Sequence, residues 1–358
     1  MQPEDKFSSL GNQFSFDERF HKLTHDMDHI SLIPLLEKAI ASRAAFVDAQ
    51  HESGFRLFNG FTEGFPDLVI DLFASTFVFY NYGDHPELDA NFLEETQGLL
   101  LNRLPWIHAG IVKMRNGKSL AERNGKRVFG TQTDRRIQEH GIWYAIDLVM
   151  HRDSGLYLDT RNLRKWLAQN SSGRSLLNTF AYTGSFGVAA SAGGASRVVQ
   201  VDRNRRFLNL AKDSYSLNRF AIHKPDFITA DFFPTVSKLK RTDQTFDILI
   251  LDPPFFSATP RGRVDQEHDT ARLINKVRPL INDRGILITI NNALYVSGKE
   301  FIKMLETLCE DGYLEIKDFI PVPEDFTGYP GTRVGSPVTD PAPFNHSTKI
   351  AVLEVRRK

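Results

Sequence analysis

The residues best suited to chemistry follow short apolar segments in the second half of the chain. One such segment, FDILILD (246–252), runs into Asp252-Pro253-Pro254-Phe255-Phe256. Two consecutive prolines cannot continue a strand ladder or a helix, so they hold a rigid loop. The loop presents a carboxylate, a proline carbonyl and an aromatic ring, which together can grip a planar base. The alternative is a simple strand end with a hydrophobic plug.

Two other apolar segments end in an aspartate. RVVQVD (197–202) ends in Asp202, whose carboxylate can accept two hydrogen bonds from a ribose diol. DFITAD (226–231) ends in Asp231, which could accept from an adenine amino group while Phe232 packs on the ring. Aspartate is also favoured immediately before a helix, so helix capping is the alternative for both residues.

A glycine-containing loop follows SLLNTF (175–180). Gly184 allows the backbone to approach a ligand closely, and the helix after it offers free N–H groups to an anion. The loop is not GxGxxG, so the dinucleotide-binding fingerprint is missing. An NAD-dependent enzyme is therefore disfavoured.

The elements that must position these residues alternate between strand and helix after about residue 149. Apolar strands that alternate with helices predict an α/β fold with a doubly wound, mostly parallel sheet. In such a sheet, ligands bind outside the carboxyl ends of the strands, where the strand order reverses. We expect strands at 175–180, 197–202, 226–231, 246–252, 285–290 and 348–355, helices near 186–192, 204–217, 266–281 and 298–310, and a long loop at 321–347.

The first 150 residues have a different pattern. The run HISLIPLLEKAIASRAAFV predicts a helix with one apolar face. LVIDLF and TFVFYNY predict the strands of a hairpin, and two Asn-Gly pairs predict tight turns. We expect a helical extension (1–50), a small α+β domain that binds substrate (51–148) and a catalytic domain (149–358). The residues behind these expectations are Ile30, Ile33, Leu36, Ile40 and Ala44 for the helix face, and Gly60, Gly64, Pro66, Asn116-Gly117 and Asn124-Gly125 for the turns.

The net charge of zero conceals an uneven distribution. Residues 1–100 carry 17 acidic and 6 basic groups, and the rest of the chain carries 27 acidic and 38 basic groups. Between Arg103 and Arg136 there are nine basic residues and two acidic ones. This asymmetry suggests a polyanionic partner, with a solvated surface as the alternative.

The composition excludes several classes of protein. With 41% hydrophobic and 25% charged residues the chain is neither disordered nor fibrous. No apolar run approaches the ~18–20 residues that span a bilayer, and the N-terminus lacks a signal-peptide pattern. The single cysteine, Cys309, excludes an intrachain disulfide and a multi-thiolate metal site. We expect a cytoplasmic protein without a metal or a membrane partner.

Four segments together resemble a class I S-adenosylmethionine (SAM) dependent methyltransferase. They are LNTFAYTGSFG (177–187), VVQVDRN (198–204), ITADFF (228–233) and ILDPPFF (250–256). More narrowly, RLFNGFTEGFPDLVIDLF (56–73) and SGLYLDTRNLRKWL (154–167) are similar to segments of the RlmI/RlmK type of large-subunit rRNA methyltransferase. The resemblance implies a seven-stranded Rossmann-like sheet, SAM as cofactor and RNA as partner.

The resemblance also implies roles for individual residues. Asp202 would bind the ribose, Asp231 and Phe232 the adenine, and the loop after the first strand the methionine half of SAM. The full set is Tyr157, Asp159, Arg161, Phe180, Tyr182, Thr183, Gly184, Asp202, Asp231 and Phe232 for SAM; Asp252, Pro253, Pro254 and Phe255 for catalysis; and Lys113, Arg115, Lys118, Phe256, Asn291 and Asn292 for RNA.

Two departures from the family pattern bear on the chemistry. The cytosine-C5 members carry an N-terminal PUA domain, which we expect to be missing here because only about 50 residues precede the hairpin. They also carry cysteines where this chain has Asn291-Asn292. Methylation of cytosine C5 needs a thiolate, and Cys309 reads as a core residue of a helix. We therefore expect methyl transfer to a nitrogen, guanine N7 or an exocyclic amino group.

Two alternatives from other functional classes remain at this point. A methyltransferase of a small molecule or a protein side chain would have the same fold but no need of a basic surface. A non-catalytic RNA-binding protein could reuse the scaffold, although it would have no need to keep the SAM loop, Asp202 and Asp252-Pro253-Pro254-Phe255 together.

Overall fold

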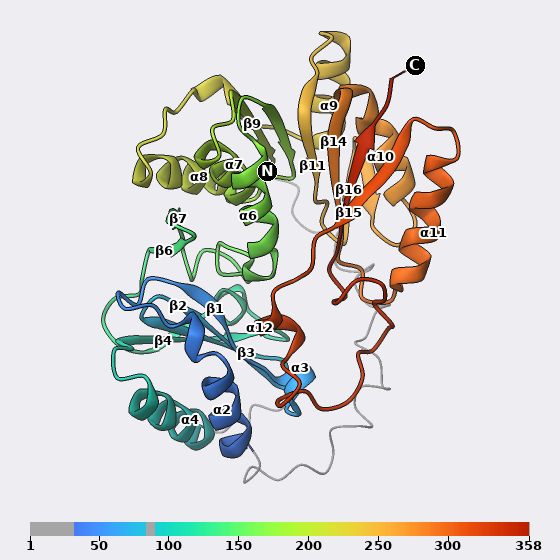
Figure 1. Ribbon diagram of the computed structural model, residues 1–358. Helices are drawn as coiled ribbons and strands as arrows, with labels where there is room; N and C mark the ends of the chain where they lie inside the picture. Colours follow the sequence, from blue (N-terminus) through green and yellow to red (C-terminus); the bar gives the residue numbers. More distant parts are fainter. Residues whose placement is uncertain (1–31, 84–89, 358) are drawn as a thin grey trace, which may run out of the picture.

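The computed structural model describes residues 32–83 and 90–357, which form two large sheets with their covering helices and two two-stranded sheets (Figure 1). The earlier part of the chain builds a five-stranded sheet, and the later part builds a seven-stranded one. Of the expected N-terminal extension, residues 1–31 lie outside the described residues. No helix in the described ranges combines the length and the apolar character needed to cross a membrane.

The five-stranded sheet has the order β1-β2-β3-β4-β5. The expected hairpin is confirmed, since β2 and β3 pair antiparallel from Leu68↔Asn81 to Phe73↔Thr76. β4 joins β3 in parallel, and β5 closes the sheet as an edge strand. The strands are β1 (Gly54–Asn59), β2 (Leu68–Phe73), β3 (Thr76–Asn81), β4 (Ala109–Met114) and β5 (Lys126–Phe129), with α3 (Gly60–Glu63) between β1 and β2.

The helices α2 (Leu32–Ser42) and α4 (Ala90–Arg103) pack their apolar residues on this sheet. The predicted face of α2 was only partly right: Leu36 is buried as expected, but its buried neighbours are Leu32 and Ala39, Ile33 and Ala44 are exposed, and Ile30 lies outside the described residues. The face continues to Arg43, which is fully buried in an ion pair with Glu63. The prediction from the sequence considered only apolar residues, so it left out Arg43. It therefore assigned the buried face of the helix to neighbouring positions.

The second Asn-Gly pair is not a hairpin turn. Asn124 ends the short helix α5 (Leu120–Asn124), and Gly125 (φ 108°) provides its C-terminal cap. The helix begins in a capping box, in which the Ser119 hydroxyl accepts from the Glu122 N–H and the Glu122 carboxylate accepts from the Ser119 N–H. The capping box therefore determined the local structure, and only Asn116-Gly117 forms the expected turn.

The seven-stranded sheet has the order β10-β9-β8-β11-β14-β16-β15, which confirms the doubly wound fold. The first five strands are parallel, and β16 runs antiparallel to both of its neighbours. The strand order reverses between β8 and β11. The strands are β8 (Ser175–Thr179), β9 (Arg197–Asp202), β10 (Phe227–Thr229), β11 (Phe246–Leu251), β14 (Ile281–Asn291), β15 (Leu314–Phe319) and β16 (Lys349–Val355).

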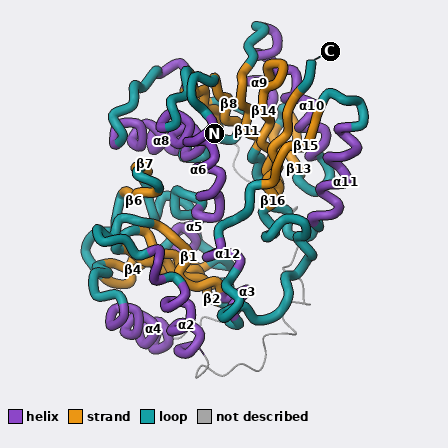
Figure 2. Tube along the Cα trace, in the orientation of Figure 1, coloured by secondary structure: helices purple, strands orange, loops and turns teal. Residues whose placement is uncertain are grey.

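Helices cover both faces of this sheet (Figure 2). Alternate residues of the central strands serve opposite faces: Leu176 and Ile248 pack with α6 and α7, and Leu177 and Leu249 pack with α9, α10 and α11. Burial on both sides explains why these strands read as continuous apolar runs. The helices are α6 (Arg161–Asn170), α7 (Ser185–Ala192), α8 (Arg205–Leu217), α9 (Phe232–Arg241), α10 (Thr270–Val277) and α11 (Gly298–Cys309).

Several short elements were not expected from the sequence. The hairpin β12 (Phe256–Thr259) and β13 (Gly262–Asp265) precedes α10, so the predicted helix at 266–281 begins later. The predicted loop 321–347 contains α12 (Glu324–Thr327). The remaining elements are β6 (Arg136–Glu139), β7 (Ile142–Ala145) and the 3₁₀ turns η2 (Ala44–Phe46), η3 (Leu158–Thr160), η4 (Lys224–Asp226) and η5 (Arg278–Leu280).

A buried set of charges ties the two sheets together through α12, which lies against β1 although about 270 residues separate them (Figure 1). The Asp325 carboxylate accepts from the Arg56 backbone N–H (2.9 Å) and from the Arg161 guanidinium (2.5 Å). Its backbone carbonyl accepts from Arg43 (2.9 Å), which also pairs with Glu63. Because Arg161 begins α6, the network fixes the segment that leads into the seven-stranded sheet.

Candidate active site

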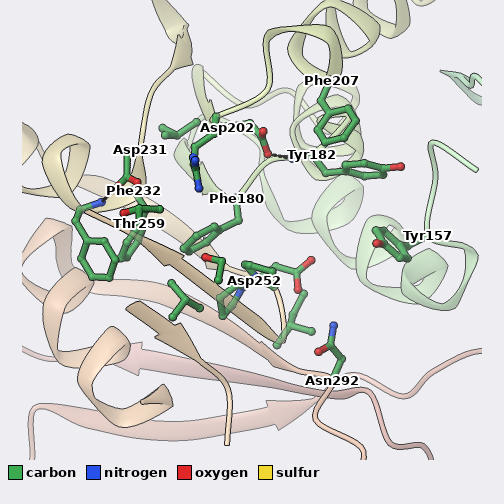
Figure 3. A pocket seen from close by; sticks show the side chains of 18 of the residues that line it. Tyr157, Phe180, Tyr182, Asp202, Phe207, Asp231, Phe232, Asp252, Thr259 and Asn292 are labelled. Atoms are coloured by element: carbon green, nitrogen blue, oxygen red, sulfur yellow. Dashed lines mark hydrogen bonds between the residues drawn. The ribbon is translucent and has the colours of Figure 1, made fainter. Parts of the chain in front are cut away.

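A cavity of about 280 Å³ opens at the carboxyl ends of the parallel strands, where the strand order reverses (Figure 3). This is the position that the doubly wound topology predicts for a ligand. Segments from the ends of β8, β9, β10, β11 and β14 contribute to its wall. Eleven of the residues singled out from the sequence line it: Tyr157, Asp159, Phe180, Tyr182, Asp202, Asp231, Phe232, Asp252, Pro253, Pro254 and Asn292.

The loop after β8 is held in an unusual backbone conformation. Phe180 (φ 55°) and Tyr182 (φ 49°) are in the left-handed region, which side chains other than glycine rarely adopt. Such conformations cost on the order of 1–3 kcal/mol each and cluster at functional sites. Residue 184 (φ 73°) must be a glycine, because a Cβ there would lie 2.6 Å from the Gln200 side chain.

Asp202 lies at the end of β9 and points toward the cavity (Figure 3). One carboxylate oxygen accepts from the Tyr182 N–H (2.8 Å), and the other accepts from the Asn204 N–H (2.7 Å). Burial raises the pKa of this carboxyl group above its usual value. The residue thus anchors the strained loop after β8 and keeps oxygen lone pairs available to a ligand.

Asp231 and Phe232 combine the two roles that the sequence left open. The Asp231 carboxylate accepts from the Phe233 N–H (3.0 Å) and so caps α9, yet the residue also lines the cavity. The Phe232 ring is buried and stacks on the Phe180 ring with 4.6 Å between centroids. The two rings give the cavity an aromatic wall that suits a flat, apolar group.

Asp252 lies in the middle of the cavity wall, close enough to Asp159 for the two charges to interact. Burial, and then the charge of Asp159, raise the pKa of Asp252 to about 7. Burial also raises the pKa of Asp159, which accepts a hydrogen bond from the Thr348 hydroxyl (3.1 Å). Two neighbouring carboxyl groups in one cavity disfavour each other's ionised form.

Among the residues that the structure describes, three carboxylates of the cavity form no ion pair with lysine or arginine. They are Asp159, Asp202 and Asp252. The exposed Arg203 also lines the cavity and lowers the pKa of Asp202 only in part. Buried carboxylates are normally paired, so this cavity fits a ligand that brings positive charge.

Four of the predicted SAM-binding and catalytic residues are not brought to the cavity wall. Arg161 is committed to Asp325, and the Thr183 hydroxyl donates to the Gly155 carbonyl (2.5 Å). Gly184 lies against Gln200, and Phe255 is exposed and does not line the cavity. Thr183 and Gly184 therefore shape the loop from within, whereas Arg161 holds the preceding segment.

Lys113 and Arg115 correct the expectation of an RNA-binding surface. Lys113 is fully buried and donates to the His151 carbonyl (2.7 Å), and burial lowers its pKa to about 7. Arg115 pairs with Asp153 (3.1 Å). Both side chains thus serve the packing of β4 on the 151–153 segment, and of the three only Lys118 is exposed.

The two asparagines after β14 separate in the structure. Asn291 is buried, and its amide donates to the Gln266 backbone carbonyl (3.0 Å). Asn292 is exposed to the cavity and faces the same space as Asp252 (Figure 3). Of the pair, only Asn292 can contact a ligand in this cavity.

Sequence reasoning missed several residues of the cavity wall. Phe207 of α8 packs edge-on against Tyr182, with 4.5 Å between ring centroids. Ser257, Thr259 and Val264 line the cavity from the β12–β13 hairpin. The turn residues Pro260 and Gly262, with alternating side chains on either side of them, could have predicted that hairpin. No feature of the sequence indicated that Phe207 or Thr348 would line the cavity.

Comparisons with known proteins agree with this geometry. The family model of S-adenosylmethionine-dependent methyltransferases matches residues 128–331. YwbD of Bacillus subtilis, a candidate ribosomal RNA large subunit methyltransferase, is 29% identical over 84% of this chain and 76% of its own length. Ribosomal RNA large subunit methyltransferase I of Aeromonas salmonicida is 30% identical over 62% of this chain and 56% of its own length, so the chain spans about half of that relative.

A solved structure supports the fold. SMU.776, a candidate methyltransferase in complex with SAH, superposes with a TM-score of 0.78 at 24% identity, covering 92% of this chain and 83% of that one. SAM carries a sulfonium, an ammonium and an adenine ring, which fit the unpaired carboxylates and the aromatic wall. The chain belongs to the S-adenosylmethionine-dependent methyltransferase family and is an enzyme that uses SAM.

Proposed function

We propose that this enzyme methylates a base of large-subunit ribosomal RNA on a nitrogen, guanine N7 or an exocyclic amino group, and not on cytosine C5. The names of the relatives that cover most of the chain support the RNA substrate. The position of the single cysteine supports nitrogen as the acceptor.

The cysteine argument rests on what C5 chemistry requires. Cytosine C5 is a poor nucleophile, so its methylation ordinarily needs a thiolate that adds to C6. Cys309 is the only cysteine in the chain, and it packs on the core near the end of α11, not in the cavity. Burial raises the pKa of its thiol, which disfavours the thiolate further. A nitrogen acceptor needs no such residue.

The residues of the cavity would divide the work of binding and orientation. Bound SAM supplies a methyl group that its positive sulfur has already activated. We assign Asp202 to the ribose, Asp231, Phe232 and Phe180 to the adenine side, and Asp252 to the target base. Holding both reactants in line is then the main contribution of the protein.

The Pro253 carbonyl needs a revised role. It accepts a hydrogen bond from the Gln266 side chain, so it is already engaged within the protein. Asp252 and Asn292 are therefore the polar groups that we assign to the base. The exposed rings of Phe255 and Phe256, just outside the cavity, are suited to stack on the base or its neighbours.

RNA would lie against the edge strand β5. This strand and its flanks expose basic side chains with few acidic ones, in contrast to the buried Lys113. We propose residues 51–148 as the domain that holds the RNA backbone and 149–358 as the catalytic domain. The exposed cations are Lys118, Lys126, Arg127, Arg135 and Arg136.

The function is tested by nucleoside mass spectrometry of ribosomal RNA from a strain that lacks the protein. We expect one N-methylated nucleoside to disappear from large-subunit RNA and to return with the wild-type gene but not with Asp252→Ala. Loss of 5-methylcytidine would refute the nitrogen assignment. The RNA substrate would be refuted if the modified nucleosides of the ribosomal RNA were unchanged in this strain and the enzyme transferred methyl groups to a component of an RNA-depleted extract.

The RNA surface is tested by charge reversal. The double variant Lys126→Glu, Arg127→Glu should weaken binding of a ribosomal RNA fragment. The slope of log K against the logarithm of the salt concentration should become less steep by about one for each phosphate contact that is lost. The control is Lys238→Glu with Arg241→Glu at the end of α9 that lies away from the cavity. Equal effects of the two pairs would remove β5 from the RNA-binding surface.

A further inference from the structure

Gln266 occupies the turn between β13 and α10, and neither the sequence motifs nor the cavity lining point to it. It is almost completely buried, with 1% of its surface exposed. Its backbone N–H donates to the Phe255 carbonyl (3.0 Å), and its backbone carbonyl accepts from the Asn291 amide (3.0 Å). The backbone alone thus connects the loop after β11 with the end of β14.

The side chain of Gln266 makes the same connection a second time. Its Oε1 accepts from the Asn292 backbone N–H (2.7 Å), and its Nε2 donates to the Pro253 carbonyl. Both partners are backbone groups with a single possible role, so they fix which end of the amide is oxygen and which is nitrogen. Only a side chain with one donor and one acceptor at this length completes the bridge.

The two loops that Gln266 joins carry the polar groups assigned to the target base. Asp252 directly precedes Pro253, and Asn292 is itself one of the hydrogen-bonded residues. β11 and β14 are adjacent parallel strands, but beyond their last paired residues, Leu251↔Thr289, no ladder bond sets the distance between the loops. The Gln266 amide therefore joins the residue after Asp252 directly to Asn292, in addition to the bonds of its own backbone.

We propose that Gln266 is a positioning residue for methyl transfer, which sets the separation of Asp252 and Asn292 across the cavity and occupies the Pro253 carbonyl. This inference rests on the proposed function, since it assumes that Asp252 and Asn292 orient the acceptor base. It implies that the base is held by side chains and not by the proline carbonyl.

Two variants separate positioning from folding. Gln266→Ala removes both bonds and should lower the single-turnover rate on ribosomal RNA by at least tenfold while SAM affinity, measured by calorimetry, stays within about threefold. Gln266→Glu keeps the shape but replaces the donor. When the introduced carboxyl is protonated it can again donate to Pro253, and burial beside a carbonyl favours that neutral form.

The pH profile of Gln266→Glu provides a signature that a loss of stability would not produce. Its rate relative to wild type should be highest near pH 6 and fall at least fivefold by pH 8.5, as the introduced carboxyl ionises. The titratable groups nearby are Asp252 in the joined loop, Asp265, Glu267 and His268 in the same turn, Asp269 at the start of α10 and Lys349, which donates to the Ala293 carbonyl. All are present in wild type, so their own titration appears in both profiles, and the ratio reports the introduced carboxyl together with its coupling to Asp252.

The matched control is Glu267→Gln, an exposed neighbour in the same turn, which should keep the wild-type rate and profile. A wild-type rate for Gln266→Ala, a flat ratio for Gln266→Glu, or loss of SAM binding in both variants would overturn the proposal. If wild type methylates no ribosomal RNA, the proposed function fails separately, and the variants are then compared on the acceptor that wild type does use.

Discussion

The two large sheets of this enzyme differ in whether the buried charged side chains around them have partners. Around the five-stranded sheet, buried charges have partners within the fold: Arg43 pairs with Glu63 at 2.9 Å, Arg56 pairs with Asp71 at 2.8 Å, and Lys113 donates to the His151 carbonyl at 2.7 Å. At the carboxyl ends of the seven-stranded sheet, carboxylates such as Asp202 lack a cationic partner among the described residues, and burial raises their pKa. The first arrangement is complete in itself, whereas the second is completed by a ligand.

This difference separates structural residues from functional ones better than residue type does. Arg161 and Lys113 looked like ligand-binding cations, but each has its partners within the fold: Asp325 for Arg161, and backbone carbonyls for Lys113. Asp252 has a pKa raised to about 7 because its environment does not balance its charge. A buried charge without a partner is the better indication of a site.

The largest effect should come from breaking a paired charge. Arg43→Ala leaves Glu63 buried and unpaired, which should lower the free energy of unfolding by about 3–5 kcal/mol. Urea denaturation followed by circular dichroism measures the change. The control is Arg103→Ala, whose partner Glu37 is at the surface, where solvent screens the pair and its loss should change stability little. Equal losses in the two variants would contradict the comparison.

Removing the central unpaired carboxylate should affect turnover and not stability. Asp252→Ala should lower the methyl-transfer rate by about 100-fold, the cost of a mispositioned reactant. The variant should retain SAM binding in calorimetry and should melt no lower than wild type, since a buried carboxyl without a partner is removed. A large loss of SAM affinity instead would assign Asp252 to the cofactor.

The unpaired carboxylate at the end of β9 should matter for the cofactor. Asp202→Ala should weaken SAM binding by at least about tenfold, because hydrogen bonds to a charged group contribute ~1.5–3 kcal/mol. The control is Asp226→Ala, a carboxylate that immediately precedes β10 and is paired with Arg197 at 2.8 Å. Unchanged SAM affinity for Asp202→Ala in calorimetry would remove this residue from the site.

The sequence predicted what depends on local pattern and on topology. Continuous apolar strands between helices identified the doubly wound sheet, and its topology brings Asp202, Asp231 and Asp252 to one edge. Long-range partners were beyond such reasoning. The carbonyl that accepts from Lys113 comes from His151, 38 residues later, and the bond from Asn292 to Gln266 spans 26 residues. Burial of a polar residue depends on partners of this kind, which a charge count cannot locate.

The most direct test of the central claim compares SAM with SAH as a function of pH. SAM carries a positive charge on sulfur and SAH does not. The sulfur of SAM should therefore stabilise the ionised form of Asp252, whereas the sulfur of SAH should not. Asp252 loses its proton at about pH 7 in the free enzyme, so the ratio of SAM affinity to SAH affinity should rise between pH 5.5 and 8. We predict an increase of at least about threefold, measured by calorimetry, and its absence in Asp252→Asn. A ratio that does not change with pH would show that Asp252 does not interact with the sulfonium charge, which contradicts this account of the cavity.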